Sequence, residues 1–311
     1  MNNSNFTIIT FYQFKKVKRP TSLKKKLHDF CSFNKLRGTA LIAIEGVNGT
    51  LAGMKNDIEL FIALLKNEGF KNLELKYSYY KYMPFNRLKI KIKKEIVTFR
   101  SRNIDPENST GHHVQSKKWN QLIKNKDTIV IDVRNNFEVK MGSFQGAINP
   151  NTENFSQFKK YVDNKLEKFK HKKIAIFCTG GIRCEKASSY MINNGFKYVH
   201  QLKGGILKYL EDTKKNESQW EGECFVFDNR VSVQNELKNG TYELCHACRN
   251  PINYNDKKNK MYKKGVSCPN CFDKISSKKK KSLIERNKQI NISKKKGLYN
   301  PYTRYTTDDF Y

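Results

Sequence analysis

The stretch Phe177-Cys178-Thr179-Gly180-Gly181-Ile182-Arg183-Cys184-Glu185-Lys186 decides how the middle of the chain folds. It follows the apolar, β-branched run 173–177, which predicts a buried parallel strand. It leads into a helical pattern that extends to about residue 192. Cys178 is therefore expected at the end of a strand, in a tight loop that opens a helix. The two glycines let backbone N–H groups turn inward, and such groups at a helix N-terminus stabilise an anion.

The group best placed to occupy this loop is the sulfur of Cys178. A thiolate held there is expected to have a lowered pKa and to act as a nucleophile at neutral pH, with Arg183 as a second catalytic residue. The alternative is a buried structural cysteine in an ordinary strand-to-helix turn. Cys184 is either a resolving thiol for an oxidised Cys178 or a packing residue that faces the sheet. The anion cradle is predicted to consist of the loop residues Thr179, Gly180, Gly181 and Ile182.

The loop resembles the active-site loop of rhodanese domains, in which the cysteine carries a persulfide. It has six residues from Cys178 to Arg183, as in that family, whereas the related phosphatases have one residue more. The resemblance therefore implies sulfur chemistry rather than phosphate hydrolysis. Asp132-Val133-Arg134 with Glu138 resembles a second rhodanese signature, in which Asp132 and Arg134 are expected to be structural ion partners.

Strands and helices alternate over residues 116–228, which predicts a rhodanese-like α/β domain with a parallel sheet and helices on both faces. Residues 1–100 show the order β-α-β-β-α-β of a ferredoxin-like α+β unit. Within it, 45–53 is interpreted as a glycine-rich connection and 88–99 as a strand. The polar residues 101–115 are interpreted as a linker, in which His112 and His113 are expected to be exposed to solvent.

The C-terminal part contains two cysteine pairs, Cys245-His246-Ala247-Cys248 and Cys268-Pro269-Asn270-Cys271, separated by nineteen residues. Two C-x-x-C pairs at this separation can hold one tetrahedral ion. The segment 229–276 has too little apolar surface for a core of its own, so metal binding is expected to fold it. Zinc is the expected metal and iron the alternative, because the same four thiolates accept either. His246 is not expected to be a ligand.

The chain is strongly basic, with 60 Lys and Arg against 29 Asp and Glu and a formal net charge of +31. The excess is +13 over residues 1–100, +6 over 101–228 and +12 over 229–311. A genomic bias toward lysine would spread the charge evenly. The concentration on both flanks of the reactive loop therefore predicts a polyanionic partner, a nucleic acid.

Two lysine-rich segments are the candidate RNA contacts. In the first, Lys89, Lys91 and Lys93 alternate with Leu88, Ile90 and Ile92 next to several tyrosines, so that the lysines are expected to face outward. The alternative is a solvated edge strand protected by its lysines. The second is the basic tail, 277–311, which begins with the four lysines Lys278, Lys279, Lys280 and Lys281.

Cysteine usage and hydropathy indicate the compartment. The sequence has no apolar run long enough to span a bilayer and no secretory signal. Four of the eight cysteines pair as C-x-x-C and one heads a reactive loop, which suits a reducing cytoplasm. A cytoplasmic protein with no membrane partner is expected.

Taken together, four stretches resemble the rhodanese-domain tRNA uridine 5-hydroxylases: 45–50, 177–186, 222–228 and 245–271. The resemblance implies a cytoplasmic enzyme that uses molecular oxygen to hydroxylate the wobble uridine, in the anticodon stem-loop of certain tRNAs, at carbon 5. Cys178 matches the family's active-site cysteine. The residues alone do not predict hydroxylation, because they contain no haem motif, facial triad or dinucleotide fingerprint. The activation of oxygen and the reductant therefore stay open.

Two other functions are compatible with the residues alone. One is a persulfide sulfurtransferase that acts in tRNA thiolation or sulfur trafficking, and the other is a non-catalytic RNA-binding protein. The intact loop from Cys178 to Arg183 argues against the second. Cys178 itself has two possible roles in hydroxylation: it adds to carbon 6 of uracil, or it serves as a persulfide or sulfenic acid that never bonds to the base.

Overall fold

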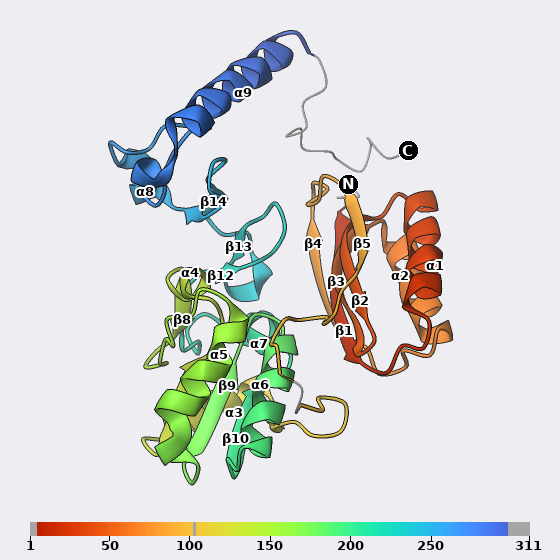
Figure 1. Cartoon of the computed structure of the whole chain (residues 1–311), viewed down its shortest axis with the longest axis vertical. Helices are drawn as coiled ribbons and strands as arrows, with labels where there is room; N and C mark the ends of the chain where they lie inside the picture. The colour runs from red at the N-terminus through yellow and green to blue at the C-terminus, as the bar shows by residue number, and fades with distance from the viewer. Residues whose placement is uncertain (1–4, 102–103, 298–311) are drawn as a thin grey trace.

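The computed structural model describes residues 5–101 and 104–297 as three parts (Figure 1). A sheet with two helices comes first, a parallel-sheet domain follows, and an extended C-terminal region ends in a long helix. The far end of the predicted basic tail, 298–311, lies outside the described residues.

The N-terminal unit is a five-stranded sheet in the order β4-β1-β3-β2-β5. The first four strands have the antiparallel order of the predicted ferredoxin-like unit, and β5 adds to β2 in parallel. The elements are β1 (Phe6–Phe14), α1 (Pro20–Phe33), β2 (Arg37–Ala43), β3 (Gly46–Gly53), α2 (Lys55–Asn67), β4 (Glu74–Tyr80) and β5 (Leu88–Ile92).

Both helices of this unit cover the same face of its sheet (Figure 1). Leu27 of α1 and Phe61 of α2, each on the apolar stripe of its helix, pack against Phe11 and its neighbours in one buried cluster. Successive side chains of a strand point to opposite faces. Thr10 and Tyr12 on β1 therefore lie on the other face, which looks toward the middle domain.

The sequence interpretation was wrong about the connection at 45–53. The hairpin turn lies at residues 44–45, and Gly46–Gly53 is strand β3. A Cβ atom at Gly49 would lie 2.7 Å from both the carbonyl oxygen of Thr39 and the ring of Phe11. The glycine is therefore required by close packing within a strand, and not by a turn.

The last strand of the unit is shorter than expected. β5 ends at Ile92, and not near residue 99. Ile90 is buried and the lysines beside it are exposed, as the alternation predicted, but Ile92 is 43% exposed. Residues 93–100 instead cross toward the middle domain, where Phe99 packs into its core.

The middle domain has the predicted parallel sheet, in the order β6-β10-β9-β7. Alternate residues of β9 enter two separate cores: Ile174 and Ile176 pack with α5 and α6, whereas Ala175 and Phe177 pack with α3 and α7. Helices therefore cover both faces, as expected. The elements are β6 (His112–Val114), α3 (Ser116–Lys124), β7 (Thr128–Asp132), α4 (Asn136–Val139), β8 (Gly142–Phe144), α5 (Phe158–Tyr161), β9 (Lys173–Phe177), α6 (Ile182–Asn193), β10 (Tyr198–Leu202) and α7 (Gly205–Asp212).

Two details of this domain differ from the sequence interpretation. Strand β6 lies in the predicted linker and pairs with β10; it has only three residues, two of them histidines, so no apolar pattern marked it. The pattern of residues 155–170 predicts a single amphipathic helix, but the structure has 3-10 turns at both ends of this segment, a short α-helix and a π-turn at Val162–Leu166.

The C-terminal region consists of short hairpins that lead to a nineteen-residue helix, α9 (Ser277–Lys295). The sequence of the basic tail predicts a helix only over 282–292, so α9 is longer than expected. Leu283 anchors α9 to the cysteine cluster, and most of its other side chains are exposed. The remaining elements are β11 (Trp220–Gly222), β12 (Cys224–Phe225), β13 (Ser232–Val233), β14 (Glu243–Leu244), β15 (Pro251–Ile252) and α8 (Tyr254–Lys258). In the described part of the chain, no helix is both long and apolar enough to cross a bilayer.

Candidate active site at Cys178

The loop after β9 has the geometry of an anion cradle. Gly181 has φ +99°, a conformation that favours glycine, and its N–H donates to the sulfur of Cys178 at 3.1 Å. The first N–H groups of α7, from Ile206 and Leu207, donate to the carbonyl oxygens of Cys178 and Thr179 at 2.9 and 3.0 Å. The loop carbonyls are thus held outward, which leaves the N–H groups for the sulfur.

The surroundings of the sulfur lower the pKa of Cys178 to about 6. Burial alone would raise this pKa, but hydrogen bonds from the Cys184 side chain and from the backbone of Cys184 and Arg183, together with the Arg183 charge, outweigh it. Cys178 is therefore mostly thiolate at neutral pH. Burial and the neighbouring Cys178 raise the pKa of Cys184, so only one of the two thiols is ionised.

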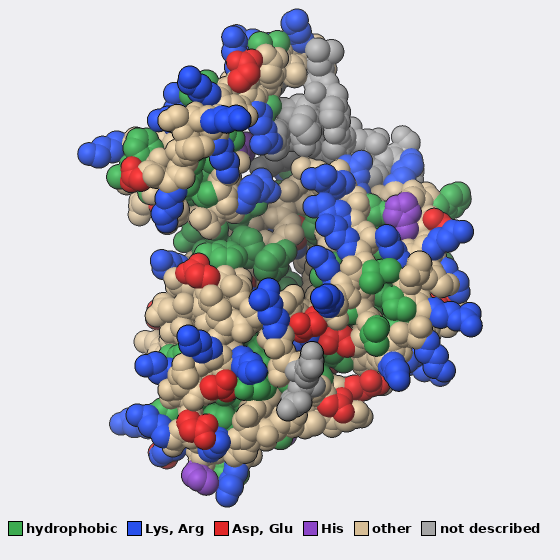
Figure 2. Space-filling view, in the orientation of Figure 1, with side chains coloured by type: hydrophobic (Ala, Val, Ile, Leu, Met, Phe, Trp, Pro, Cys, Tyr) green, Lys and Arg blue, Asp and Glu red, His purple; other side chains and the backbone are tan. Residues whose placement is uncertain are grey.

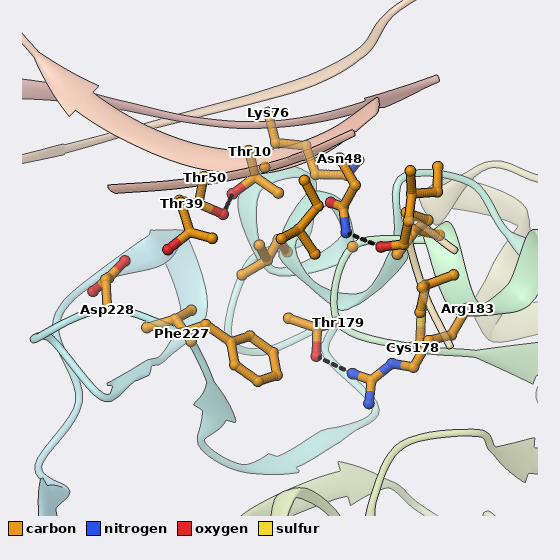
Figure 3. Close-up of a pocket in the computed structure, with 18 of the residues that line it drawn as sticks. Thr10, Thr39, Asn48, Thr50, Lys76, Cys178, Thr179, Arg183, Phe227 and Asp228 are labelled. Carbon is orange, nitrogen blue, oxygen red and sulfur yellow. Dashed lines mark hydrogen bonds between the residues drawn. The ribbon is translucent and has the colours of Figure 1, made fainter. Parts of the chain in front are cut away.

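Arg183 is held by Glu138. Its two terminal nitrogens donate to the two carboxylate oxygens, each at 2.7 Å, and one also donates to the hydroxyl of Thr179 at 3.1 Å (Figure 3). Glu138 is completely buried, but Arg183 outweighs that burial and lowers the pKa of the carboxyl. The charge of Arg183 acts on Cys178 through space, while its guanidinium is committed to this ion pair.

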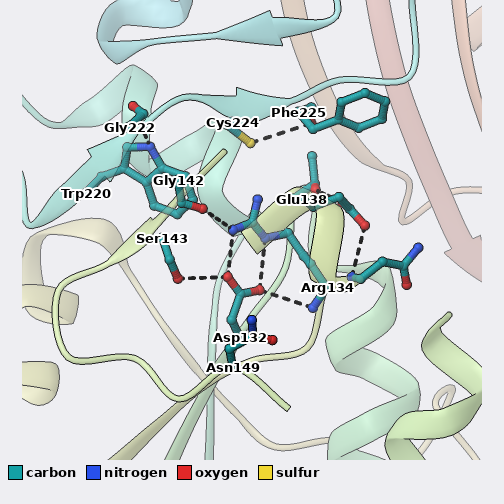
Figure 4. Close-up of polar contacts among 12 residues, drawn as sticks. Asp132, Arg134, Glu138, Gly142, Ser143, Asn149, Trp220, Gly222, Cys224 and Phe225 are labelled. Atoms are coloured by element: carbon teal, nitrogen blue, oxygen red, sulfur yellow. Dashed lines mark hydrogen bonds and ion pairs between the residues drawn. The ribbon is translucent and has the colours of Figure 1, made fainter. Parts of the chain in front are cut away.

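Asp132 and Arg134 form a second buried ion pair, at 2.6 Å (Figure 4). Arg134 also donates to the carbonyl oxygen of Gly142 and lies over the ring of Trp220, 5.0 Å from its centroid. Ser143 donates to Asp132 at 2.9 Å. The pair thus joins the end of β7 to β8 and β11, the structural role expected from the sequence.

A cavity of about 1210 Å³ opens between the Cys178 loop and the N-terminal sheet (Figure 3). This exceeds the roughly 300–1,000 Å³ of a typical small-molecule pocket. The cavity has three walls. One is the loop 178–183, and another is the turn 226–231, from which Phe227 points inward. The third wall, called the sheet wall below, comes from the strands of the N-terminal unit and consists of Thr10, Thr39, Asn48, Thr50 and Lys76.

The N-terminal unit is fixed by direct contacts to the loop and to the first turn of α6. The hydroxyl of Tyr12 donates to Glu185 at 2.9 Å, and a Cβ atom at Gly181 would lie 2.9 Å from that hydroxyl. Lys186, which is completely buried, bridges Glu45 at 2.8 Å and Glu95 at 2.6 Å. The first helical turn after the cysteine is therefore the place where the two domains are joined.

The sequence interpretation missed several residues of this region. His113, expected only to be exposed, contacts Glu185 at 3.1 Å and Gln201 at 2.7 Å from strand β6. Lys76 and Phe227 belong to the cavity, although neither is near Cys178 in sequence. Phe227 lies in 222–228, one of the four stretches that carry the family resemblance, so the sequence pointed to this turn. No sequence pattern marked Lys76.

The four cysteines Cys245, Cys248, Cys268 and Cys271 converge, with all four sulfurs within 4.8 Å of one another. Three of the sulfur–sulfur distances are 3.7, 3.7 and 3.9 Å. Four sulfurs bound tetrahedrally to one zinc ion at about 2.3 Å lie roughly 3.8 Å apart. The cluster could therefore hold a metal, and His246 is not one of its four members.

The candidate RNA-binding lysines are all exposed: Lys89, Lys91, Lys93, Lys278, Lys279, Lys280 and Lys281. Figure 2 shows Lys and Arg side chains gathered on α9 and on the N-terminal sheet, on either side of a hollow between the three parts. The four lysines of α9 occupy its first turns, where no acidic residue balances the positive end of the helix dipole. An anion bound there would stabilise the helix.

Two family descriptions match parts of the chain. Residues 6–96 match the UPF0176 acylphosphatase like domain, and residues 116–212 match the rhodanese-like domain. Among solved structures, the rhodanese-like domain of a protein from Anabaena sp. is 20% identical over 35% of this chain and 78% of that one, with a TM-score of 0.29. A rhodanese-related protein from Thermoplasma volcanium is 24% identical over 32% of this chain and 92% of that one, with a TM-score of 0.26.

A full-length relative is more informative than these single domains. The tRNA uridine(34) hydroxylase of Teredinibacter turnerae is 47% identical over 295 residues, which are 94% of this chain and 92% of the relative. At that coverage the match includes all three parts of the chain. Identity at this level over nearly the whole of both chains shows that this chain belongs to the family of tRNA uridine(34) hydroxylases.

Proposed function

We propose that this protein uses molecular oxygen to hydroxylate carbon 5 of the wobble uridine of tRNA, in the cavity that Cys178 lines. The observation that carries the proposal is a thiol with a pKa of about 6 in a cavity with room for a nucleotide. A single-stranded anticodon base can be splayed out of its stack to reach such a site. Since its substrate is tRNA, the protein is proposed to act in the cytoplasm.

The proposed role of Cys178 is nucleophilic. When its thiolate bonds to carbon 6 of uracil, the electron pair of the ring double bond moves to carbon 5 and the O4 oxygen. Carbon 5 can then bond to one atom of molecular oxygen, and the thiolate leaves carbon 6 as carbon 5 loses its proton and the ring double bond re-forms. The second oxygen atom becomes water with two electrons and two protons from a reductant. The loop N–H groups favour this route because they keep the sulfur ionised before attack.

We propose zinc for the four-cysteine site, with iron as the alternative. The spacing of the sulfurs matches a closed tetrahedral site with no open position, which suits a structural ion. When bound, the ion would hold the hairpins of the C-terminal region together. Leu283 packs into the same cluster, so the ion would also seat α9.

The exposed lysines of β5 and α9 are proposed to bind the phosphates of the anticodon stem-loop. These contacts are sequence-independent, so they would position the RNA while the cavity selects the base. The positions on either side of the hollow in Figure 2 support this arrangement.

The function is tested on tRNA nucleosides. A strain that lacks the gene is complemented with the wild type or with Cys178→Ala, and its tRNA is digested and analysed by mass spectrometry. We expect 5-hydroxyuridine derivatives to return with the wild type only, and only when the culture is aerated. A loss of thiolated bases in the deletion strain, with 5-hydroxyuridine derivatives intact, would instead identify a sulfurtransferase.

A further inference from the structure

Lys76 on β4 is a buried lysine whose ammonium makes no hydrogen bond to the residues that the structure describes. It is 8% exposed, it lines the cavity, and its Nζ has no hydrogen-bond partner in residues 5–101 and 104–297. The ammonium lies over the ring of Tyr12, 5.2 Å from its centroid. Burial of an unpartnered ammonium is costly. Its retention at the wall of a cavity indicates that a ligand supplies the missing acceptor.

Lys76 ends a row of polar side chains across the sheet wall. The strand register places it opposite Thr10, Thr10 opposite Thr50, and Thr50 opposite Thr39, so all four project from the same face. The hydroxyls of Thr10 and Thr50 are 3.1 Å apart. Figure 3 shows this row across the cavity from Thr179 and Arg183.

The row lies against the reactive loop. A Cβ atom at Gly180 would lie 4.0 Å from the methyl group of Thr10, and one at Gly204 would lie 3.6 Å from Cε of Lys76. The adjacent Gly205 touches the loop, since a Cβ atom there would lie 2.5 Å from the carbonyl oxygen of Cys178. A base that reaches the sulfur is therefore close to the ammonium.

Three other cations that line the cavity are already neutralised within the protein. Arg183 is paired with Glu138, and Arg230 with Asp228 at 2.7 Å. Lys208 contacts two carboxylates at 2.9 and 3.0 Å. Burial lowers the pKa of Lys76, and the positive charge of Lys208 lowers it further. The negative charges of Glu74, Cys178 and Glu185 act in the opposite direction and raise this pKa. Lys76 is thus a cation whose hydrogen bonds are left for a ligand.

Resting on the proposed function, we propose that Lys76 determines specificity: its ammonium donates a hydrogen bond to the O4 oxygen of the target uracil and selects uracil against cytosine. An ammonium has only donors. Uracil presents an acceptor at this position, whereas cytosine presents an amino group that is itself a donor. With cytosine bound, both buried donors would be left unsatisfied.

Phe227 supplies the complementary contact. Its side chain is 63% exposed and points into the cavity, where it can stack on the face of a base while Lys76 binds the edge. The turn that carries it is fastened to the strand of Lys76, because Arg230 donates to Ser78 at 2.9 Å. Stacking is available to any base, so the discrimination rests on Lys76.

The test compares the affinity of anticodon stem-loops with uridine or cytidine at the wobble position, measured by fluorescence anisotropy without oxygen. The variants are Lys76→Met, which keeps the length of the side chain, and Lys76→Gln, which has both a donor and an acceptor. Lys94→Met is the matched control, because Lys94 is an exposed lysine of the same cavity. The melting temperature of each variant is measured in parallel.

We expect the wild type to prefer uridine by about 100-fold, as for a hydrogen bond to a charged group. Both Lys76 variants should bind the two stem-loops within about 3-fold of each other, and Lys94→Met should weaken both and keep the ratio. Lys76→Met should melt no lower than the wild type, because the variant removes an unpartnered buried charge.

A wild type without preference, or a Lys76→Gln variant that keeps the wild-type ratio, would overturn the proposal. Equal weakening of both stem-loops in the Lys76 variants would overturn it too and would indicate a contact to phosphate. Restoration of 5-hydroxyuridine to the tRNA of an aerated deletion strain complemented with the wild type, in which the cell supplies the reductant, is measured by mass spectrometry in the same series. A failure of the wild type to form 5-hydroxyuridine counts against the proposed function. If 5-hydroxyuridine is formed but the Lys76 variants keep the wild-type ratio of uridine to cytidine affinity, only the role of Lys76 is wrong.

Discussion

The two main walls of the cavity are built in opposite ways. The loop 178–183 is one continuous stretch whose polar groups are paired within the protein: the sulfur with backbone N–H groups, and Arg183 with Glu138. The sheet wall comes from several strands and leaves the ammonium of Lys76 without a partner among the described residues. A reactive group needs a preorganised environment, whereas recognition needs groups that the substrate alone completes.

The largest effect is expected when the reactive wall loses its sulfur. Cys178→Ala should abolish hydroxylation and leave the affinity for the stem-loop within about 2-fold, because the sheet wall is intact. In the wild type, kcat/KM should fall as the pH drops below about 6, since protonation removes the thiolate. The measurement is 5-hydroxyuridine formed per enzyme, by mass spectrometry, from pH 5 to 8.

Cys31→Ala is the matched control for that variant. Cys31 is also fully buried, but it lies on α1 and packs into the N-terminal core, and burial raises its pKa to about 12. This variant should lower stability and keep turnover. The catalytic role of Cys178 would be contradicted if the Cys178→Ala variant still hydroxylated uridine, or if a folded Cys31→Ala variant lost hydroxylation.

The ion pair behind the loop can be broken by replacing either Arg183 or Glu138, and the two replacements should shift the pKa of Cys178 in opposite directions. Arg183→Met removes a positive charge and should raise it, whereas Glu138→Gln frees that charge and should lower it further. Each variant should cost about 3–5 kcal/mol of stability, because it leaves one buried partner uncompensated. The pH dependence of thiol alkylation, followed by mass spectrometry, gives the pKa. Shifts of the same sign would show that Arg183 does not act through its charge.

Metal removal should unfold the C-terminal region and leave the other two parts of the protein folded. We expect one metal per chain by elemental analysis, and we expect Cys268→Ser or a chelator to unfold the C-terminal region. The loop and the sheet wall share no residue with the cysteine cluster, so the alkylation profile of Cys178 should not change. A metal-free protein with an ordered C-terminal region, seen by hydrogen exchange, would contradict the proposed structural ion.

The smallest effect is expected from the lysines of α9. Replacing Lys278, Lys279, Lys280 and Lys281 by alanine should reduce the slope of log affinity against log salt by about 0.7–0.9 for each phosphate that the helix no longer neutralises. Turnover at saturating RNA should remain. The matched control replaces Lys165, Lys168, Lys172 and Lys173, which are exposed near the start of β9, at the other end of that strand from Cys178. A slope unchanged by the α9 substitutions would remove the helix from the RNA interface.

The difference between the two walls also explains which features could be predicted from the sequence and which could not. The Cys178 loop and the cysteine pairs are contiguous motifs, so spacing alone placed them, and strand–helix alternation gave the parallel sheet. Lys76 owes its role to the register of β4 with β1, which no local pattern specifies. Gly49 was assigned to a connection between strands because close packing against Phe11 cannot be inferred from a glycine and its neighbours.

The most direct test of the account is a zero-length photo-crosslink from the target base. An anticodon stem-loop with 4-thiouridine at the wobble position is bound to the wild type without oxygen and irradiated, and the crosslinked peptides are sequenced by mass spectrometry. Because the base lies between the walls, we expect crosslinks to the loop 178–183 and to β4 around Lys76 or the turn at Phe227. Crosslinks confined to α9 and the cysteine cluster would contradict the assignment of this cavity as the site of uridine hydroxylation.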